Sequence, residues 1–255
     1  MLSATRGLRA GGQAGTPVKD VFAPLSALGL KMRLGQMVLV AAAPNVGKSP
    51  FALNLAYRAQ LRTLYISADT DAHTQYTRLC SMHTGIPIED IARYPAGYER
   101  YISDLHHIQF VYESSLSQDD VDDELMAYAQ VYGAWPEIIV VDNLANIDAG
   151  GDDRWGGLES VCDYLHDVAR KTGALIVALH HVTGEHENGD SPVPLSGLRG
   201  KISKVPEQVL TLWRAGDDTW PKMGVAIVKN RGGNASAAGH YNTLLSWDLE
   251  RGILA

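Results

Sequence analysis

The stretch AAAPNVGKSPFALNLA, residues 41–56, decides the fold expected for this chain. From Ala42 to Ser49 it fits the pattern G-x-x-x-x-G-K-[ST], except that alanine replaces the first glycine. An apolar run, MVLVAA (37–42), precedes the loop, and apolar residues at helical spacing follow it. A strand, a glycine-containing loop and a helix in this order are typical of a phosphate-binding loop. We therefore expect a nucleotide site here.

Each position of this loop has an expected role. Gly47 lets the backbone approach a phosphate closely, Lys48 reaches the β- and γ-phosphates, and Ser49 offers a hydroxyl ligand to Mg²⁺. Ala42 stands at the strand end, where a small residue suffices. Pro50 falls in the first helical turn, where a missing N–H costs little. The nucleotide-binding residues predicted on this basis are Ala43, Pro44, Asn45, Val46, Gly47, Lys48, Ser49 and Pro50.

Further apolar runs predict a mainly parallel sheet. Several of them lack alternation of apolar and polar residues, as strands buried on both faces should. Helical patterns at 118–132 and 158–171 lie between them, with Ser117 as the expected N-cap of the first. Strands that alternate with helices indicate an α/β fold with helices on both faces of the sheet. The expected strands are 37–42, 63–67, 108–112, 137–142 and 174–179, followed by an antiparallel extension made of 208–214, 224–230 and 241–249.

The bulk properties indicate one sizeable domain. The chain has 255 residues, 45% of them hydrophobic and 20% charged, which is ordinary for a globular protein. No apolar run is long enough to cross a membrane, and we expect a cytoplasmic protein. The net charge of −7 argues against a broad basic surface that coats DNA. Residues 1–30 are expected to form a flexible arm or linker, and residues 31–255 the domain itself.

A second part of the expected site is acidic. It is Asp142, at the end of the strand EIIVVD (137–142). A carboxylate at a strand end often serves only as a cap or turn residue. Because a phosphate loop lies upstream, we expect Asp142 to hold Mg²⁺ instead, together with Ser49.

The order of these motifs resembles the RecA-like ATPase core of hexameric helicases, both the DnaB-type replicative and the RepA-type plasmid helicases. The resemblance covers roughly residues 30–251 and includes LYISADTDAHTQYTRL (64–79), GALIVALHHVTG (173–184) and VAIVKNRGG (225–233). It implies a RecA-like P-loop ATPase with an antiparallel C-terminal extension. The cofactors it implies are ATP and Mg²⁺, and the chain would be a stand-alone core, phage- or plasmid-encoded.

The resemblance also implies catalytic roles and partners. Asp69 matches the family's water-activating glutamate, with Asp71 as the alternative, and His181 matches the γ-phosphate sensor. Lys229 and Arg231 match a Lys-x-Arg hairpin that reaches across a subunit interface. The catalytic set is thus Lys48, Asp69, His181, Lys229 and Arg231. The partners implied are single-stranded or branched DNA and further copies of the chain in a hexameric ring.

Other functions fit the same residues. One alternative is a metal-dependent nuclease on the same core. Histidine and glutamate side chains that could bind a divalent metal, together with nearby carboxylates, allow it: His180, His181, Glu185 and His186. A nucleotide-switched scaffold or loader that hardly turns over ATP is a third possibility. A small-molecule kinase is a weaker fourth, because the His-His strand end and the KNR hairpin point away from it.

Overall fold

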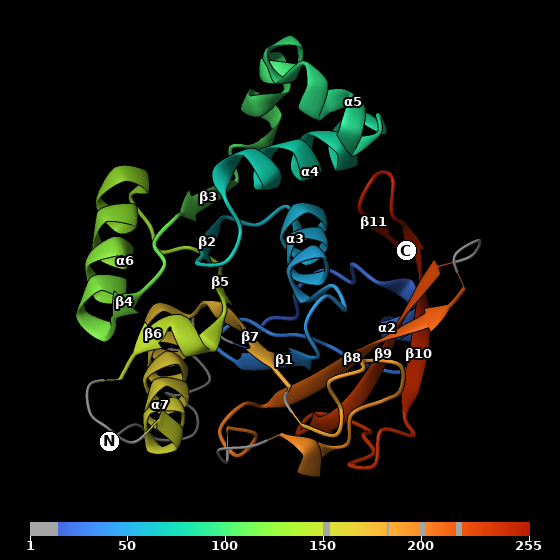
Figure 1. Cartoon of the computed structure of the whole chain (residues 1–255). Coiled ribbons are helices and arrows are strands. Elements are labelled where there is room, and N and C mark those ends of the chain that lie inside the picture. The colour runs from blue at the N-terminus through green and yellow to red at the C-terminus, as the bar shows by residue number, and fades with distance from the viewer. Residues whose placement is uncertain (1–14, 150–153, 183, 199–201, 218–220) are drawn as a thin grey trace.

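The computed structural model describes residues 15–149, 154–182, 184–198, 202–217 and 221–255. Three layers form the body, with a central sheet between two sets of helices (Figure 1). In the described ranges the sheet has nine strands in the order β11-β10-β9-β8-β1-β7-β5-β2-β3. Its strands are β1 (Met37–Ala42), β2 (Thr63–Ser67), β3 (Ile108–Val111), β5 (Ile138–Asp142), β7 (Leu175–His181), β8 (Gln208–Gly216), β9 (Pro221–Asn230), β10 (Asn242–Asp248) and β11 (Ile253–Leu254).

The strands from β3 to β8 are parallel, and β9, β10 and β11 extend the sheet in antiparallel fashion. Two short strands pair in a separate sheet. The helices are α2 (Ala23–Ala27), α3 (Lys48–Ala59), α4 (Ala72–Thr84), α5 (Ile88–Arg93), α6 (Gln118–Tyr132) and α7 (Arg154–Thr172), with 3₁₀ turns η1 (Pro95–Leu105), η2 (Leu144–Asn146) and η3 (Leu195–Gly197), and the short strands are β4 (Leu116–Ser117) and β6 (Ile147–Asp148).

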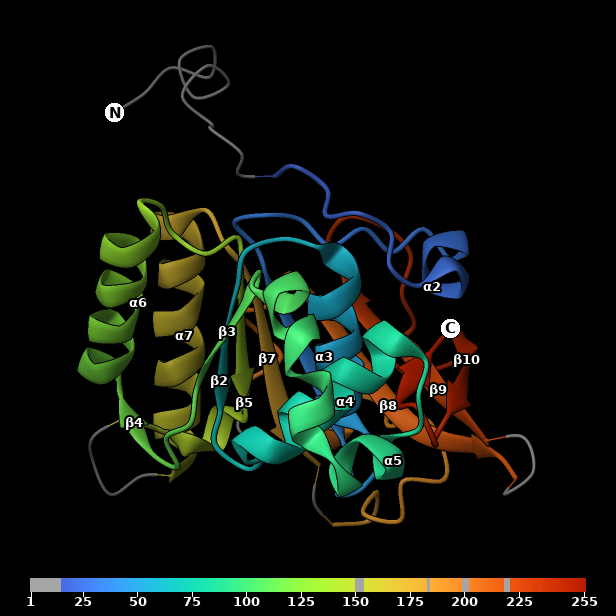
Figure 2. The ribbon, with the colours of Figure 1, turned by 90° about the horizontal axis from the view of Figure 1, so that it is seen from above.

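Burial on both faces explains the continuous apolar strands. All six residues of β1 are buried, with alternate side chains in two separate cores. Val38 and Val40 belong to the core that includes α3, whereas Met37 and Leu39 belong to the core that includes α6 and α7. Figure 2 shows α6 and α7 side by side at one side of the molecule. The α/β, mainly parallel fold with its antiparallel extension is therefore confirmed.

Local signals in the sequence set the ends of α6. The Ser117 hydroxyl accepts a hydrogen bond from the Asp120 N–H, and the Asp120 carboxylate accepts one from the Ser117 N–H. This reciprocal capping box satisfies two backbone donors at the helix start. Gly133 ends the helix with φ 70°, a left-handed conformation that glycine adopts without steric cost.

Some element boundaries differ from the expectation. Helix α7 begins at Arg154, whereas the apolar pattern predicts a start at 158, because Gly156 and Gly157 interrupt the apolar spacing in its first turn. Strand β8 is longer than expected and pairs in parallel with β1, so the antiparallel extension begins only at β9. The unit made of α4, α5 and η1 lies beyond α3 on the same side of the sheet (Figure 1), and its last two elements have no counterpart in the prediction.

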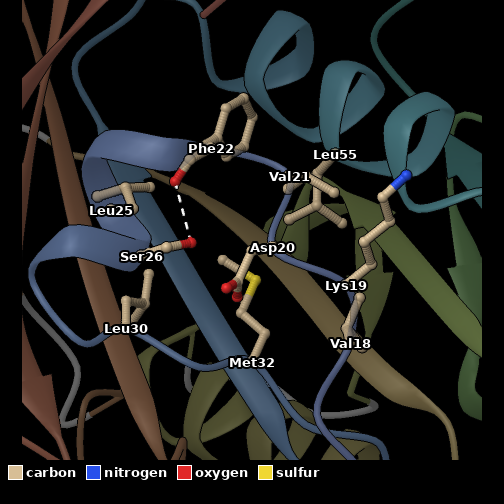
Figure 3. Close-up of a pocket in the computed structure, with 10 residues that line it drawn as sticks. All are labelled: Val18, Lys19, Asp20, Val21, Phe22, Leu25, Ser26, Leu30, Met32 and Leu55. Carbon is tan, nitrogen blue, oxygen red and sulfur yellow. Dashed lines mark hydrogen bonds between the residues drawn. The ribbon is translucent and has the colours of Figure 1, made fainter.

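The described part of the expected arm, residues 15–30, is packed and not loose. Phe22 and Leu25 are each 2% exposed, and the Phe22 ring stacks on Phe51 of α3 with centroids 4.9 Å apart. The Ser26 hydroxyl donates to the Phe22 carbonyl oxygen at 3.2 Å, and both residues line a small pocket together with Leu55 of α3 (Figure 3). Flexibility is thus the wrong expectation for residues 15–30, because their apolar side chains complete the core above α3. Residues 1–14 lie outside the described part of the chain, and the domain boundary at residue 30 stays a prediction.

We expect Phe22→Ala to lower the free energy of unfolding by about 3–5 kcal/mol, because it removes a buried ring and leaves a cavity against Phe51. Urea unfolding followed by circular dichroism measures the change. Asp20→Ala, at an exposed position of the same segment, is the matched control and should change stability by less than about 0.5 kcal/mol. Equal midpoints for the two variants would contradict the packing of this segment on the core.

Candidate nucleotide site

The phosphate loop connects β1 to α3 at the carboxyl edge of the parallel strands. Gly47 has φ 107°, and a Cβ there would overlap the Trp247 ring of β10. Asn45 is also left-handed, with φ 59°. The loop therefore requires glycine at position 47 for two reasons, its backbone conformation and the close approach of Trp247.

Lys48 lies at the centre of the site and is 5% exposed. Its ammonium group donates to the carbonyl oxygens of Ala42 and Ala43, each at 3.1 Å, and contacts His181 Nδ1 at 3.1 Å. Burial lowers the pKa of Lys48 to about 8, although the carboxylates of Asp142 and Asp69 oppose that shift. The two carboxylates expected in the site, Asp69 and Asp142, thus act on the charge of Lys48. The two carbonyl oxygens and His181 Nδ1 accept its hydrogen bonds and hold the ammonium group at the loop.

The contact with Lys48 determines the proton position on His181. An ammonium group only donates, so Nδ1 of the ring must accept and carries no proton. Burial, and then the charge of Lys48, lower the pKa of His181, which favours the neutral ring. The remaining N–H is on Nε2, which lies 3.6 Å from Oδ2 of Asp69. His181 therefore joins the lysine of the phosphate loop to the expected catalytic carboxylate.

Asp69 lies in the loop between β2 and α4. Its Oδ2 accepts a hydrogen bond of 2.7 Å from the side-chain amide of Asn143, the residue after Asp142. Asp71, the alternative candidate, is the N-cap of α4 and accepts from both the N–H and the hydroxyl of Thr74, at 3.0 and 2.7 Å. These two hydrogen bonds lower the pKa of Asp71. The geometry favours Asp69 over Asp71 as the carboxylate available for chemistry.

Asp142 ends β5 and is 2% exposed. Burial raises its pKa, and hydrogen bonds with the hydroxyls of Ser49 and Tyr65 oppose that rise. The Tyr65 hydroxyl donates to Asp142 Oδ2 at 3.0 Å. A carboxylate beside a serine hydroxyl supplies the oxygen ligands that Mg²⁺ prefers, so the residues present fit this cation.

These residues share one pocket of about 450 Å³, a volume that suits a nucleotide. The expected residues Lys48, Asp69, Asp142 and His181 all line it. Sequence reasoning gave no role in this pocket to Trp247, and it also missed Asn143 and Tyr65 behind the site. Only the position of Asn143 directly after Asp142 was a usable signal. The described lining is Pro44, Asn45, Gly47, Lys48, Ser49, Pro50, Asp69, Thr70, Arg78, Asp142, His181 and Trp247.

Two expected catalytic residues, Lys229 and Arg231, do not line this pocket in the described chain. Val209 of β8 pairs with Lys229, and Gln208 pairs with Val38 near the start of β1. The phosphate loop follows the other end of β1. Lys229 and Arg231 thus lie at the opposite edge of the sheet from their own nucleotide site, roughly 17 Å away along the strand.

Comparison with known proteins shows the family of this chain. Residues 18–187 match AAA_25, an AAA domain family. The chain belongs to this family of ATPases. The Gene 65 protein of Mycobacterium phage L5 is 45% identical over 239 residues, covering 89% of this chain and 88% of the phage protein.

More distant proteins share the fold. A probable plasmid replicative DNA helicase of Chlamydia muridarum is 22% identical, over 89% of this chain and 52% of that protein. The structure of a DnaB-like replicative helicase, described with its interactions with primase, superposes with a TM-score of 0.79. It is 18% identical and is matched over 98% of this chain and 64% of its own. These matches confirm the expected likeness to the ATPase core of DnaB-type helicases.

In the part of the chain that the structure describes, no helix is both long and apolar enough to cross a membrane. The same described residues contain no group of three or more His, Cys, Asp or Glu side chains placed to hold a metal ion. The metal cluster that the alternative nuclease function would need from His180, His181, Glu185 and His186 is therefore not found there.

Proposed function

We propose that this protein is an ATP-hydrolysing motor that assembles as a ring, hexameric by resemblance, and acts on single-stranded or branched DNA in the cytoplasm of a bacterial or phage-infected cell. One observation carries the proposal. The phosphate loop, Asp69, Asp142 and His181 meet in one pocket, while Lys229 and Arg231 lie at the opposite edge of the sheet. Such an arrangement suits head-to-tail subunits, in which each copy completes the site of the next.

Binding of ATP begins at the loop. Lys48 exchanges its contacts with the carbonyls of Ala42 and Ala43 for the β- and γ-phosphates, and the loop N–H groups surround the phosphate chain. Ser49 and Asp142 are the residues that would hold Mg²⁺, which offsets negative charge on the phosphates when bound. Trp247 forms the wall of the pocket beside Gly47 and Pro50.

Hydrolysis needs an oriented water molecule and stabilisation of developing charge. We assign the first task to Asp69, which Asn143 holds from one side and His181 faces from the other. His181 contacts the γ-phosphate once Lys48 has moved. Arg231, assisted by Lys229, enters from the neighbouring subunit and stabilises the transferring phosphoryl group.

The test of this function is the ATPase rate as a function of protein concentration, with and without single-stranded DNA. A rate per subunit that rises with assembly and rises again with DNA is the expected result. ATP binding with a nucleotide-dependent change in mass, but negligible turnover, would support the switched scaffold or loader instead. Cleavage of branched DNA by a Lys48→Ala variant with Mg²⁺ would support the nuclease.

We expect Tyr65→Phe to weaken the binding of Mg²⁺ in the presence of ATP, raising the half-saturating Mg²⁺ concentration about 10-fold. The substitution removes the hydroxyl that orients the Asp142 carboxylate. Titration of Mg²⁺ at fixed ATP, followed by tryptophan fluorescence, measures it. Tyr76→Phe is the control, since it removes a hydroxyl that donates to the Pro95 carbonyl outside the site. Identical titrations for both variants would show that Tyr65 does not orient Asp142.

A further inference from the structure

Glu207 immediately precedes β8 and lies at the edge of the sheet opposite to the nucleotide site, where its carboxylate contacts three other residues. Its carboxylate is 12% exposed. Oε2 accepts from the backbone N–H of Met37 at 3.0 Å, and Oε1 contacts His166 Nε2 at 3.1 Å and Arg231 Nη1 at 3.2 Å. Three elements, β1, α7 and the end of β9, therefore meet on one carboxylate.

The backbone repeats the same links. The Glu207 N–H donates to the Met37 carbonyl, and the Arg231 N–H donates to the Glu207 carbonyl, both at 3.0 Å. Both the main chain and the side chain of Glu207 thus form hydrogen bonds with Met37 and with Arg231. Since Met37 begins the strand that leads into the phosphate loop, the position of Arg231 is fixed relative to the sheet and not only to its own hairpin.

The neighbouring loop adds to this support. The Lys204 carbonyl accepts from Arg231 Nη2 at 3.0 Å and from Lys229 Nζ at 2.7 Å, and the Ser203 carbonyl accepts from Lys229 Nζ at 2.6 Å. The side chain of Arg231 is nevertheless 51% exposed. A guanidinium has five N–H donors, and these side-chain contacts use two, so donors remain for an anion outside the subunit.

We propose that Glu207 is a positioning residue that holds Arg231 ready for the nucleotide site of the next subunit. The inference rests on the proposed function, in which Arg231 acts across an interface. The carboxylate is partly buried and accepts hydrogen bonds from three residues, so it limits the rotamers of the long Arg231 side chain before assembly. Less conformational entropy is then lost when Arg231 meets the phosphates of a neighbour.

The experiment compares Glu207→Gln with wild type and then mixes it with Lys48→Ala. Glutamine keeps the size of the side chain but removes its charge. We expect the assembled variant to bind ATP with unchanged affinity and to hydrolyse it about 10²-fold more slowly, because the guanidinium is misplaced. ATP binding also serves as the check that the variant is folded.

Mixing distinguishes positioning of Arg231 from damage to the subunit's own site. Lys48→Ala subunits lack a working nucleotide site but keep Arg231 and Glu207. In a random 1:1 mixture, roughly a quarter of the interfaces join an intact site to an intact Arg231, so roughly a quarter of the wild-type rate should return. A general structural defect in Glu207→Gln would leave the mixture inactive.

Arg231→Ala mixed with Lys48→Ala is the reference. If this reference recovers activity and the Glu207→Gln mixture does not, the positioning role is overturned while the proposed function stands. If neither mixture recovers, action across the interface fails and both proposals fall. A wild-type rate for Glu207→Gln alone also overturns the positioning role.

Glu207→Asp is the second variant if glutamine prevents folding. It keeps the carboxylate but withdraws it by about 1.5 Å, one carbon–carbon bond. We expect a loss of about tenfold in the rate, with the same recovery on mixing; an unchanged rate would contradict the proposal.

Discussion

Lys48→Ala is expected to lower ATP turnover by at least about 10²–10³-fold, the cost of removing one charged donor from a site where negative charge develops. Lys48 is buried, and it is the only lysine among the described residues that line the pocket. Water cannot readily replace its charge there. The variant also removes the donor that fixes the proton position of His181 and faces the carboxylates of Asp69 and Asp142. The largest loss should therefore appear in turnover, with a further loss in ATP affinity.

Phosphate release at saturating ATP measures the turnover, and equilibrium binding of ATP measures the affinity. Lys31→Ala, which removes an exposed lysine, is the control and should behave as wild type. Wild-type turnover by Lys48→Ala would show that the pocket described here is not the site of hydrolysis.

Arg231→Ala is expected to lower the rate of ATP hydrolysis on the order of 10³-fold or more while leaving the affinity for ATP unchanged. The physical reason is its place in the fold. Arg231 lies at the edge of the sheet opposite to the phosphate loop, so it cannot contact the nucleotide of its own subunit. Binding within one subunit should not depend on it, whereas transition-state stabilisation in the assembled protein should.

Single-turnover hydrolysis and ATP binding, measured on the same preparation above the concentration of assembly, separate these effects. Arg93→Ala, at an exposed position of α5 where the arginine pairs with Glu89 and Asp90 of the same helix, is the control. Loss of ATP binding in Arg231→Ala would place this arginine in its own site, and an unchanged rate would exclude it from catalysis.

The sequence alone determined the fold class and most of the candidate site. Strand β1, the phosphate loop and α3 are local in sequence, and their residues carry strong local signals: six apolar residues, a glycine with positive φ and a helix start. The carboxyl ends of parallel strands lie along one edge, so residues after β1, β2, β5 and β7 could be expected to meet. Lys48, Asp69, Asp142 and His181 do meet there.

Only the tertiary structure decided which side chains support these residues. The partners are far apart in the chain: Asn143 with Asp69, Tyr65 with Asp142, and Glu207 with Arg231. Such pairs depend on the order of strands in the sheet and on single hydrogen bonds. The spacing and periodicity of residues along the sequence do not predict them. The packing of Phe22 on Phe51 was missed for the same reason, because a short apolar segment gains its structure from the core that it covers and not from its own sequence.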